Sequence, residues 1–414
     1  MVKSVGPSLR YRWVILAVAW LAFVVAFMQR LSVGPLAPFL KEELNLTSSQ
    51  AGLFMSASAL GYMITAVPAG WLVDRIGVRW LLFVGEVVGG IFIACMLFAT
   101  SFTGGLLLMA LAGLGMGCLS PATTKAVIVW FPMNERATAM GIKQTSVNLG
   151  GIITASTLPT VALLWGWRYG FLGIGLVAVV CGILSFVLYK EPPQSVSPGS
   201  PETVTSESGS PSKTKPSVRE IFKSRDIWLV ALCSMCLCIV EFAAIAYFVL
   251  YMKDSLLFTV VVAGFLLAIV DGGGAFGKPI VGLISDRLFR GGRKGVLILL
   301  CLLAFASCII FAFIGPGIAF GLLIPVTLVF GFAGVGWAGL TLSLVGEFAG
   351  KELVGIAASI SVVFGMIGNI IGPPVFGYIV DATGSYQIAW AFLAVMAILA
   401  AVFIFFVRES RRRI

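Results

Sequence analysis

The sequence predicts an all-α integral membrane protein that crosses the bilayer about twelve times. Of its 414 residues, 59% are hydrophobic and only 11% are charged, and the mean hydropathy is +1.05. A soluble domain carries roughly 25% charged residues, so this composition cannot cover a surface that faces water. The long apolar stretches do not alternate apolar and polar residues, as the strands of a membrane β-barrel would.

A helix that crosses the hydrocarbon core of a bilayer needs about 20 apolar residues. Stretches of that length recur along the chain, separated by short charged segments or by Pro and Gly. The first stretch is too long for a cleaved signal peptide and lacks a small-residue cleavage site, so we interpret it as the first span. We predict spans at residues 13–36, 48–71, 80–100, 104–131, 138–163, 168–189, 227–251, 257–284, 295–315, 317–346, 354–380 and 386–407.

Cysteine chemistry does not suggest an enzyme or a metal site. All 8 cysteines fall inside predicted spans, and the chain has no histidine. Cys233 and Cys236 form a C-x-x-C pattern, but on an apolar stretch, where small packing residues are the better interpretation. We therefore expect no cofactor, no bound metal and no catalytic residues.

The net charge of +10 reflects membrane topology rather than nucleic-acid binding. Most Lys and Arg outside the spans lie on one side, in the N-terminal tail, the central linker, several short loops and the Arg-rich C-terminus. Only Lys41, Arg168 and Lys253 lie on the other side. Cytoplasmic loops carry an excess of Lys and Arg, so we expect a multi-pass protein of the cell (inner) membrane with both termini in the cytoplasm.

A polar segment divides the chain into two halves of six spans each. Residues 191–225 begin with a stretch rich in Pro, Ser, Thr and Glu, a composition typical of a flexible linker. We predict an N-terminal bundle at residues 1–190, a cytoplasmic linker at 191–225 and a C-terminal bundle at 226–414.

The two halves repeat a charged loop. After the second span the sequence reads GWLVDRIGVRW from Gly70, and after the eighth it reads GLISDRLFRGGRK from Gly282. Internal repeats are typical of secondary transporters. We interpret the loops as gates that hold the cytoplasmic side shut, although anchoring by positive charge is an alternative. The proposed gating residues are Asp74, Arg75, Arg79, Asp286 and Arg287.

The G-x-L-x-D-R-x-G-x-R pattern of the first loop resembles the signature of the major facilitator superfamily. The resemblance covers essentially the whole chain. It implies twelve transmembrane helices in two pseudo-symmetric six-helix bundles, with helices 1, 4, 7 and 10 lining a central cavity. We expect such a protein to act as a monomer in the lipid bilayer, with no nucleic-acid partner.

Ionisable residues inside a span are costly, so they indicate function. Away from their ends, the spans contain Arg30, Lys125, Lys143, Glu241, Asp271 and Lys278, and Glu86 and Glu347 lie nearer to helix ends. Cations outnumber anions, and buried charges need partners, so an anionic substrate would balance the excess. Alternatively, single lysines reach the headgroups or bond backbone carbonyls.

Polar and aromatic neighbours extend this candidate site. Gln144 opens a polar run beside Lys143, and Pro121 disturbs the helix near Lys125. Tyr247 and Trp337 are candidates for apolar contacts with the substrate. The predicted substrate-binding residues are Arg30, Lys125, Lys143, Gln144, Lys278, Tyr247 and Trp337.

Two subfamilies share local patterns with this chain. The stretch GKPIVGLISD, which contains Lys278, is similar to the eighth helix of monocarboxylate and oxalate/formate carriers, where an arginine binds the carboxylate. The stretch QRLSVGPLAPFLKEELNLT resembles the first helix of organic-anion:cation symporters of the galactonate and hexuronate type. Arg30 matches their arginine, while Gln29 replaces their acid.

These observations favour a proton-coupled symporter of small organic anions, of the monocarboxylate or sugar-acid class. With no histidine, the proton must ride on Glu241 or Asp271, since burial favours the protonated form of a carboxylic acid. Sodium coupling is not excluded. An exporter or antiporter of drugs or metabolites is the alternative, although the fifth span lacks the proline of the antiporter motif. A transporter-like sensor would need an output domain.

Overall fold

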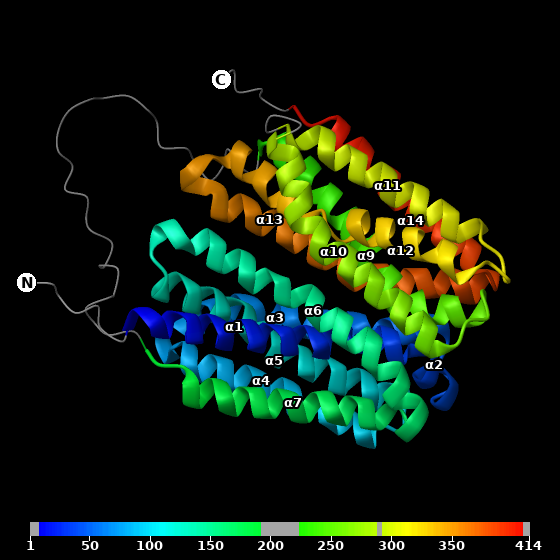
Figure 1. Cartoon of the computed structure of the whole chain (residues 1–414), viewed down its shortest axis with the longest axis horizontal. Coiled ribbons are helices and arrows are strands. Elements are labelled where there is room, and N and C mark those ends of the chain that lie inside the picture. Colours follow the sequence, from blue (N-terminus) through cyan, green and yellow to red (C-terminus); the bar gives the residue numbers. More distant parts are fainter. Residues whose placement is uncertain (1–7, 192–222, 288–291, 409–414) are drawn as a thin grey trace, which may run out of the picture.

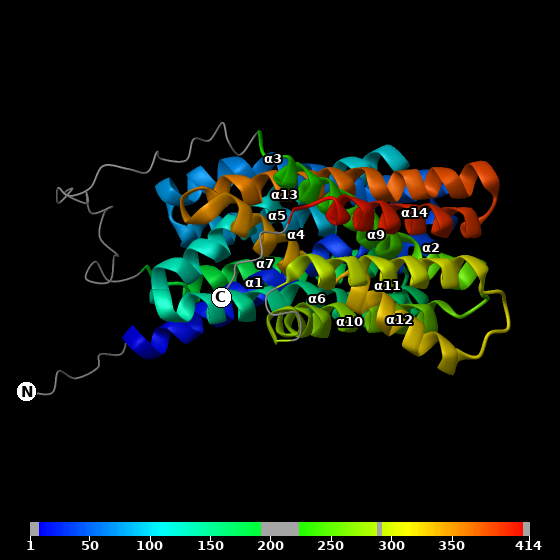
Figure 2. The ribbon, with the colours of Figure 1, turned by 90° about the horizontal axis from the view of Figure 1, so that it is seen from above.

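The computed structural model describes residues 8–191, 223–287 and 292–408, and within them the chain is helical with no strand. Twelve helical segments are long and apolar enough to cross a membrane, so the all-α fold with twelve spans is confirmed. The helices run roughly along the long axis of the molecule in both views (Figures 1 and 2).

The first half contains seven α-helices and one short 3-10 helix, because the first span is divided in two. Its elements are α1 (Ser8–Leu31), α2 (Val33–Glu43), α3 (Ser48–Ile76), α4 (Val78–Ala94), η1 (Cys95–Phe98), α5 (Phe102–Trp130), α6 (Met133–Trp165) and α7 (Trp167–Leu188). The second half contains α9 (Arg225–Asp254), α10 (Val260–Arg287), α11 (Arg293–Phe313), α12 (Phe320–Gly334), α13 (Ala338–Thr383) and α14 (Tyr386–Phe405).

The predicted linker lies almost entirely outside the described residues. The structure describes nothing between residues 191 and 223, and α9 begins at Arg225, the last residue of the predicted linker. The division of the chain at 191–225 therefore stays a prediction.

The first span differs from its prediction at one end. It runs over Tyr11–Glu43, whereas the sequence suggested an end at residue 36. The two helices of this span meet at Ser32, one turn before Pro35. A proline cannot donate a backbone hydrogen bond, and its ring crowds the carbonyl four residues earlier, here that of Leu31. The hydroxyl of Ser32 instead donates to the carbonyl of Gln29 at 2.8 Å, so the break lies directly after Arg30.

The helices connect two ends of the molecule. We call the end where α1 begins and α14 ends the terminal end, and the end with the turns at residues 44–47, 255–259 and 384–385 the far end. In the described part of the chain, the most extensive packing across the boundary between the halves joins α3 with α13, α6 with α10, and α2 with α9. The bundles converge toward the far end (Figure 1).

Glycine allows the two halves to approach closely near the far end. A Cβ on Gly34 of α2 would overlap the carbonyl of Ile245 in α9, and a Cβ on Gly264 of α10 would overlap that of Ala155 in α6. Helices in a membrane pack closely where small residues meet, so these contacts bring polar groups of both halves within reach of each other.

Candidate substrate site between the two halves

Arg30 lies in the last turn of α1 and is only 5% exposed. Its guanidinium carbon lies 5.7 Å from the ring centre of Phe27, 5.1 Å from that of Tyr62 and 5.0 Å from that of Phe242. One terminal nitrogen contacts the sulfur of Met366 at 3.8 Å, and Nε has no hydrogen-bond partner. Among the described residues, no carboxylate forms an ion pair with it. A buried cation that is surrounded by aromatic rings and a sulfur, without a direct carboxylate partner among the described residues, is a candidate site for an anion.

Lys143 lies on the same side of the site as Arg30, nearer the terminal end. Its ammonium lies 4.2 Å from the ring centre of Phe23 and donates to Thr124 at 2.9 Å, and the residue is 3% exposed. The rings of Phe23 and Phe27 pack edge to face at 5.1 Å. Phe23, Phe27 and Arg30 follow one another at helical spacing, so they share one face of α1. Two cations thus lie along one aromatic surface.

Lys278 and Asp271 are linked through the other half. The ammonium of Lys278 donates to Oδ1 of Asn148 at 2.7 Å, and Nδ2 of Asn148 donates to the backbone carbonyl of Asp271 at 3.1 Å. The carboxylate of Asp271 is 2% exposed and lies against Gly151, where a Cβ would overlap it. Lys278 follows Asp271 by seven positions on α10, so the two share one face of the helix, and the amide of Asn148 bonds to both residues from α6.

Glu241 completes a cluster of two acids and two cations. Its carboxylate accepts a hydrogen bond from the indole of Trp337 at 3.1 Å and lies within electrostatic reach of Lys278 and Arg30. Asp271 lies within electrostatic reach of Glu241 and Lys278. Direct ion pairs between these four side chains are absent from the described part of the chain. The two cations and the two acids therefore interact over distance and through neighbours such as Asn148 and Trp337.

Asn369 is a residue that sequence reasoning missed. It is 1% exposed, and neither its Oδ1 nor its Nδ2 has a hydrogen-bond partner. It follows Met366, the residue that contacts Arg30, by three positions on α13, so the two are neighbours on the helix surface. Its helix packs on α9 at Gly368 and on α3 at Pro373, which places Asn369 between these faces, toward the interior.

Some signals in the sequence could have indicated these residues. A polar amide inside a span is as unusual as a charge, and Asn148 and Asn369 both qualify. Nothing in the sequence singles out Tyr62, Phe242 or Met366 from the many other apolar and aromatic residues of the spans. Tyr62 reaches Arg30 through the packing of the first half, and Phe242 and Met366 reach it through the docking of the second half on the first.

Three of the predicted substrate-binding residues lie apart from this cluster. Lys125 forms an ion pair with Asp74 at 2.7 Å toward the terminal end and bonds the carbonyl of Val73. Gln144 is exposed on α6. Tyr247 is 1% exposed, and its hydroxyl donates to the backbone of Ser48, so it joins the two halves instead of facing an open site.

Three of the five proposed gating residues have partners in their own half. Arg75 stacks over Trp71 at 3.7 Å, and Arg79 donates to the carbonyl of Phe186 at 2.6 Å. Asp74 is held by Lys125, as above. Arg287 is exposed at the end of α10, and the side chain of Asp286 lies outside the described residues. The gating role concerns a state in which the terminal end is closed, so it stays a prediction.

Two helical bundles that are joined more tightly at one end and enclose buried charges between them have the architecture expected of a secondary transporter. The chain belongs to the Major Facilitator Superfamily, whose sequence model matches residues 19–371. The family consists of membrane transporters, and this chain is a multi-pass membrane transporter and not an enzyme.

Individual relatives share the whole length of the chain. It is 29% identical to the "Probable sulfoacetate transporter" of Cupriavidus necator over 96% of this chain and 94% of that protein. It is 26% identical to the hexuronate transporter of Bacillus subtilis, over 92% and 91% of the two chains. The fold is similar to the crystal structure of a bacterial homologue of the human lysosomal transporter Spinster, with a TM-score of 0.81 at 17% identity, over 97% and 99% of the chains.

Proposed function

We propose that this protein transports small organic anions across the cell membrane by alternating access, with Arg30 as the principal anion-binding group. The observation that carries the proposal is the buried guanidinium of Arg30, which has aromatic neighbours, an unpartnered Nε and no carboxylate. A carboxylate or sulfonate would supply two acceptor oxygens in the geometry that a guanidinium prefers. The relatives named as sulfoacetate and hexuronate transporters support the same substrate class.

Both halves contribute to the proposed site. Arg30 and Lys143 come from the first half, and Lys278, Trp337 and Asn369 from the second, so a bound anion would bridge them. Such a ligand interacts differently with the two arrangements of the halves, which is the condition for it to shift their equilibrium. Alternating access then requires only that the bundles rock around this site.

The coupling ion in this proposal is a proton carried by Glu241 or Asp271. Both acids lie in spans, where a charge without a direct partner is unfavourable and the neutral form is favoured. Each also lies near Lys278, so protonation of either acid changes the field in which the anion binds. We propose symport, because an anion and a proton together carry less charge through the membrane than the anion alone.

We also propose that the terminal end faces the cytoplasm. The far end carries Lys41, Arg168 and Lys253, and each of them has a polar partner there. The terminal end carries many more Lys and Arg, which is the pattern of cytoplasmic loops. On this orientation the conformation described above is the one that releases its substrate inward.

Uptake by the purified protein in liposomes tests the proposal. We would measure the accumulation of radiolabelled carboxylates and sulfonates, including galactonate, glucuronate and sulfoacetate, with and without an imposed pH gradient. Saturable uptake that the gradient drives and that Arg30→Ala removes is the expected result. If no anion in the panel is transported while uncharged solutes are, the organic-anion assignment is wrong.

A further inference from the structure

The far end of the molecule is held shut by a carboxylate of one half on a helix of the other. Asp381, near the end of α13, accepts hydrogen bonds from the backbone N–H groups of Ser48 and Ser49, each at 2.7 Å. These residues open α3, and the first N–H groups of a helix have no partner within it. A carboxylate there also interacts favourably with the positive end of the helix dipole. Asp381 thus caps a helix that belongs to the opposite bundle.

Tyr247 fastens the same point from α9. Its hydroxyl donates to the carbonyl of Ser48, and its ring stacks on Phe376 at 4.8 Å between centroids. The hydroxyl fits between Gly52 of α3 and Gly377 of α13, and a Cβ on either glycine would overlap it. One glycine comes from each half, so the socket exists only while the halves are docked. Ser48 therefore has both its N–H and its carbonyl bound by the second half.

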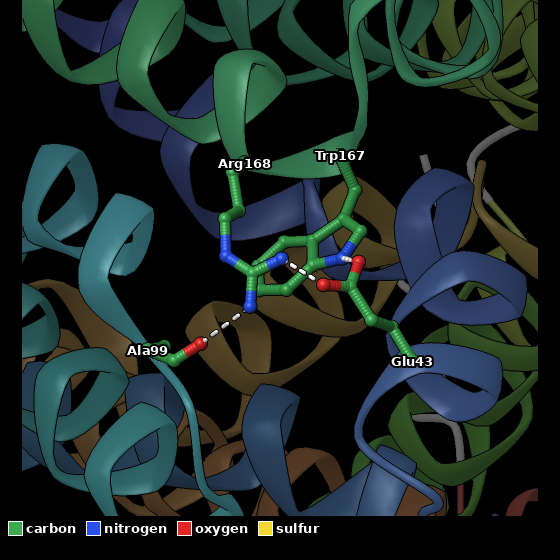
Figure 3. A network of polar contacts seen from close by, with 4 residues as sticks. All are labelled: Glu43, Ala99, Trp167 and Arg168. Carbon is green, nitrogen blue, oxygen red and sulfur yellow. Dashed lines mark hydrogen bonds and ion pairs between the residues drawn. The ribbon is translucent and has the colours of Figure 1, made fainter.

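In the first half, the end of α2, a few residues before Ser48, is anchored to α7. Figure 3 shows Glu43, at the end of α2, bound by the indole of Trp167 and by Arg168, which also donates to the carbonyl of Ala99 at 3.0 Å. These contacts fix α2 to α7 inside the first half. Opening of the far end can therefore separate the halves without unravelling α2.

A third contact between the halves is weaker. Glu42, beside Glu43, pairs with Lys253 of α9, at the edge of a hollow of about 580 Å³ between α2 and α9. The side chains of Lys253 and Glu42 are 32% and 66% exposed, and such solvent-exposed pairs contribute little. Tyr247 and Asp381 both act on Ser48, which is 1% exposed, and further inward the hydroxyl of Ser56 joins the same helices α3 and α13 by donating to the carbonyl of Ile370 at 2.6 Å.

We propose that Tyr247 and Asp381 form a far-end latch that sets how often the transporter opens at its far end. The latch acts on the equilibrium between the two arrangements of the halves and touches neither Arg30 nor the acids of the central cluster. It does not depend on the identity of the substrate. Loss of either side chain should favour the state with the far end open, because the groups on Ser48 can then bond water instead.

The distance between the halves at the far end tests this proposal directly. Cysteines at Tyr169 and Gln387, exposed residues at the starts of α7 and α14, would carry spin labels for pulsed electron paramagnetic resonance. Each of the eight native cysteines is buried or partly buried, and the protein without the two new cysteines serves as the labelling blank. The full chain is measured in lipid, without substrate.

Tyr247→Phe and Asp381→Asn are each expected to raise the ratio of the longer to the shorter distance about tenfold. Two variants make matched controls inside the second half. Tyr251→Phe, on the same helix as Tyr247, removes a hydroxyl bond to the backbone carbonyl of Phe311 in α11, and Asp226→Asn weakens a bond from the backbone N–H of Arg408. Neither contact crosses between the halves, so both controls should keep the wild-type distribution.

Distance distributions for Tyr247→Phe and Asp381→Asn that match those of the two controls would overturn the latch. Asp381 is exposed, so its replacement is expected to leave folding intact, and this variant alone decides the question if Tyr247→Phe does not fold. Size-exclusion profiles and helical circular dichroism establish folding for every variant. A shift in the same direction in both test variants, and in neither control, supports the latch.

Discussion

The guanidinium of Arg30 lies 5.0 Å from the ring centre of Phe242, across the boundary between the two halves. Phe242 follows Glu241 directly in α9, so the cation of one half and the acid of the other meet at one level of the molecule. Any rocking of the bundles moves Phe242 relative to Arg30. If Arg30 binds the anion as proposed, its affinity is thereby tied to the conformation of the transporter.

Replacing Arg30 by alanine is expected to reduce uptake of an organic anion about a hundredfold. Truncating one member of a buried charge pair costs roughly 3 kcal/mol, and that corresponds to about two orders of magnitude in affinity. Arg30→Lys should restore uptake only in part, because an ammonium lacks the planar fork of a guanidinium. Initial uptake rates in liposomes, measured over a range of substrate concentrations, provide the comparison. Equal activity of Arg30→Lys and wild type would contradict bidentate binding.

Lys278→Ala is expected to abolish anion transport while the protein still inserts and folds. Lys278 is held by Asn148 of the opposite half and lies near both acids of the cluster, so its loss changes the charge balance of the site. Asn148→Leu is the informative companion, because it removes the partner and keeps the charge. If Lys278 acts only by holding the halves together, the two variants should be impaired alike; normal uptake by Lys278→Ala would remove it from the site.

The sequence predicted the fold well because lipid imposes strong local constraints. Every span needs a long apolar stretch, and this requirement located all twelve helices. The charged residues inside spans were equally visible. Arg30, Glu241, Asp271 and Lys278 do gather at the boundary between the halves.

The partners of these charges could not be predicted, because they depend on docking between distant segments. Lys125 and Lys143 lie at similar depths in neighbouring spans, yet Lys125 pairs with Asp74 and Lys143 lies over Phe23. Helix direction and rotation decide between these outcomes, and apolar lipid-facing and core-facing residues look alike in a sequence. Tyr247 illustrates the same limit, since its role at the interface rests on two glycines from different halves.

Asn369→Leu is expected to weaken transport of hydroxylated acids selectively, by about tenfold. The amide of Asn369 offers a donor and an acceptor that are both unpartnered, next to Met366 beside Arg30. A hydroxyl group can satisfy both, whereas a plain alkyl chain satisfies neither. Galactonate and hexanoate have the same charge and carbon number, so competition by each against labelled substrate isolates the hydroxyl contribution. An equal loss for both ligands would show that Asn369 acts on packing instead.

Proton coupling is expected to fail when the acid that carries the proton is made permanently neutral. Glu241→Gln and Asp271→Asn each mimic the protonated acid. The variant of the coupling residue should lose uphill accumulation driven by a pH gradient. It should still exchange labelled for unlabelled substrate, because exchange does not require the empty carrier to return and release its proton.

The two acids differ in what else their replacement disturbs. Glu241 lies on α9 and accepts from Trp337, a bond that the carbonyl oxygen of glutamine can also accept, so Glu241→Gln should fold normally. Asp271 lies against Gly151 and near Lys278, and Asp271→Asn leaves that lysine with less opposing charge. If Asp271 serves only to balance Lys278, its variant should lose exchange as well as accumulation. Accumulation and exchange are therefore measured on the same liposomes for both variants. Accumulation driven by the pH gradient that survives in both would exclude these acids as proton carriers and direct attention to sodium, to Glu347 or to Glu86, a buried acid that accepts from Gln29 at 3.2 Å.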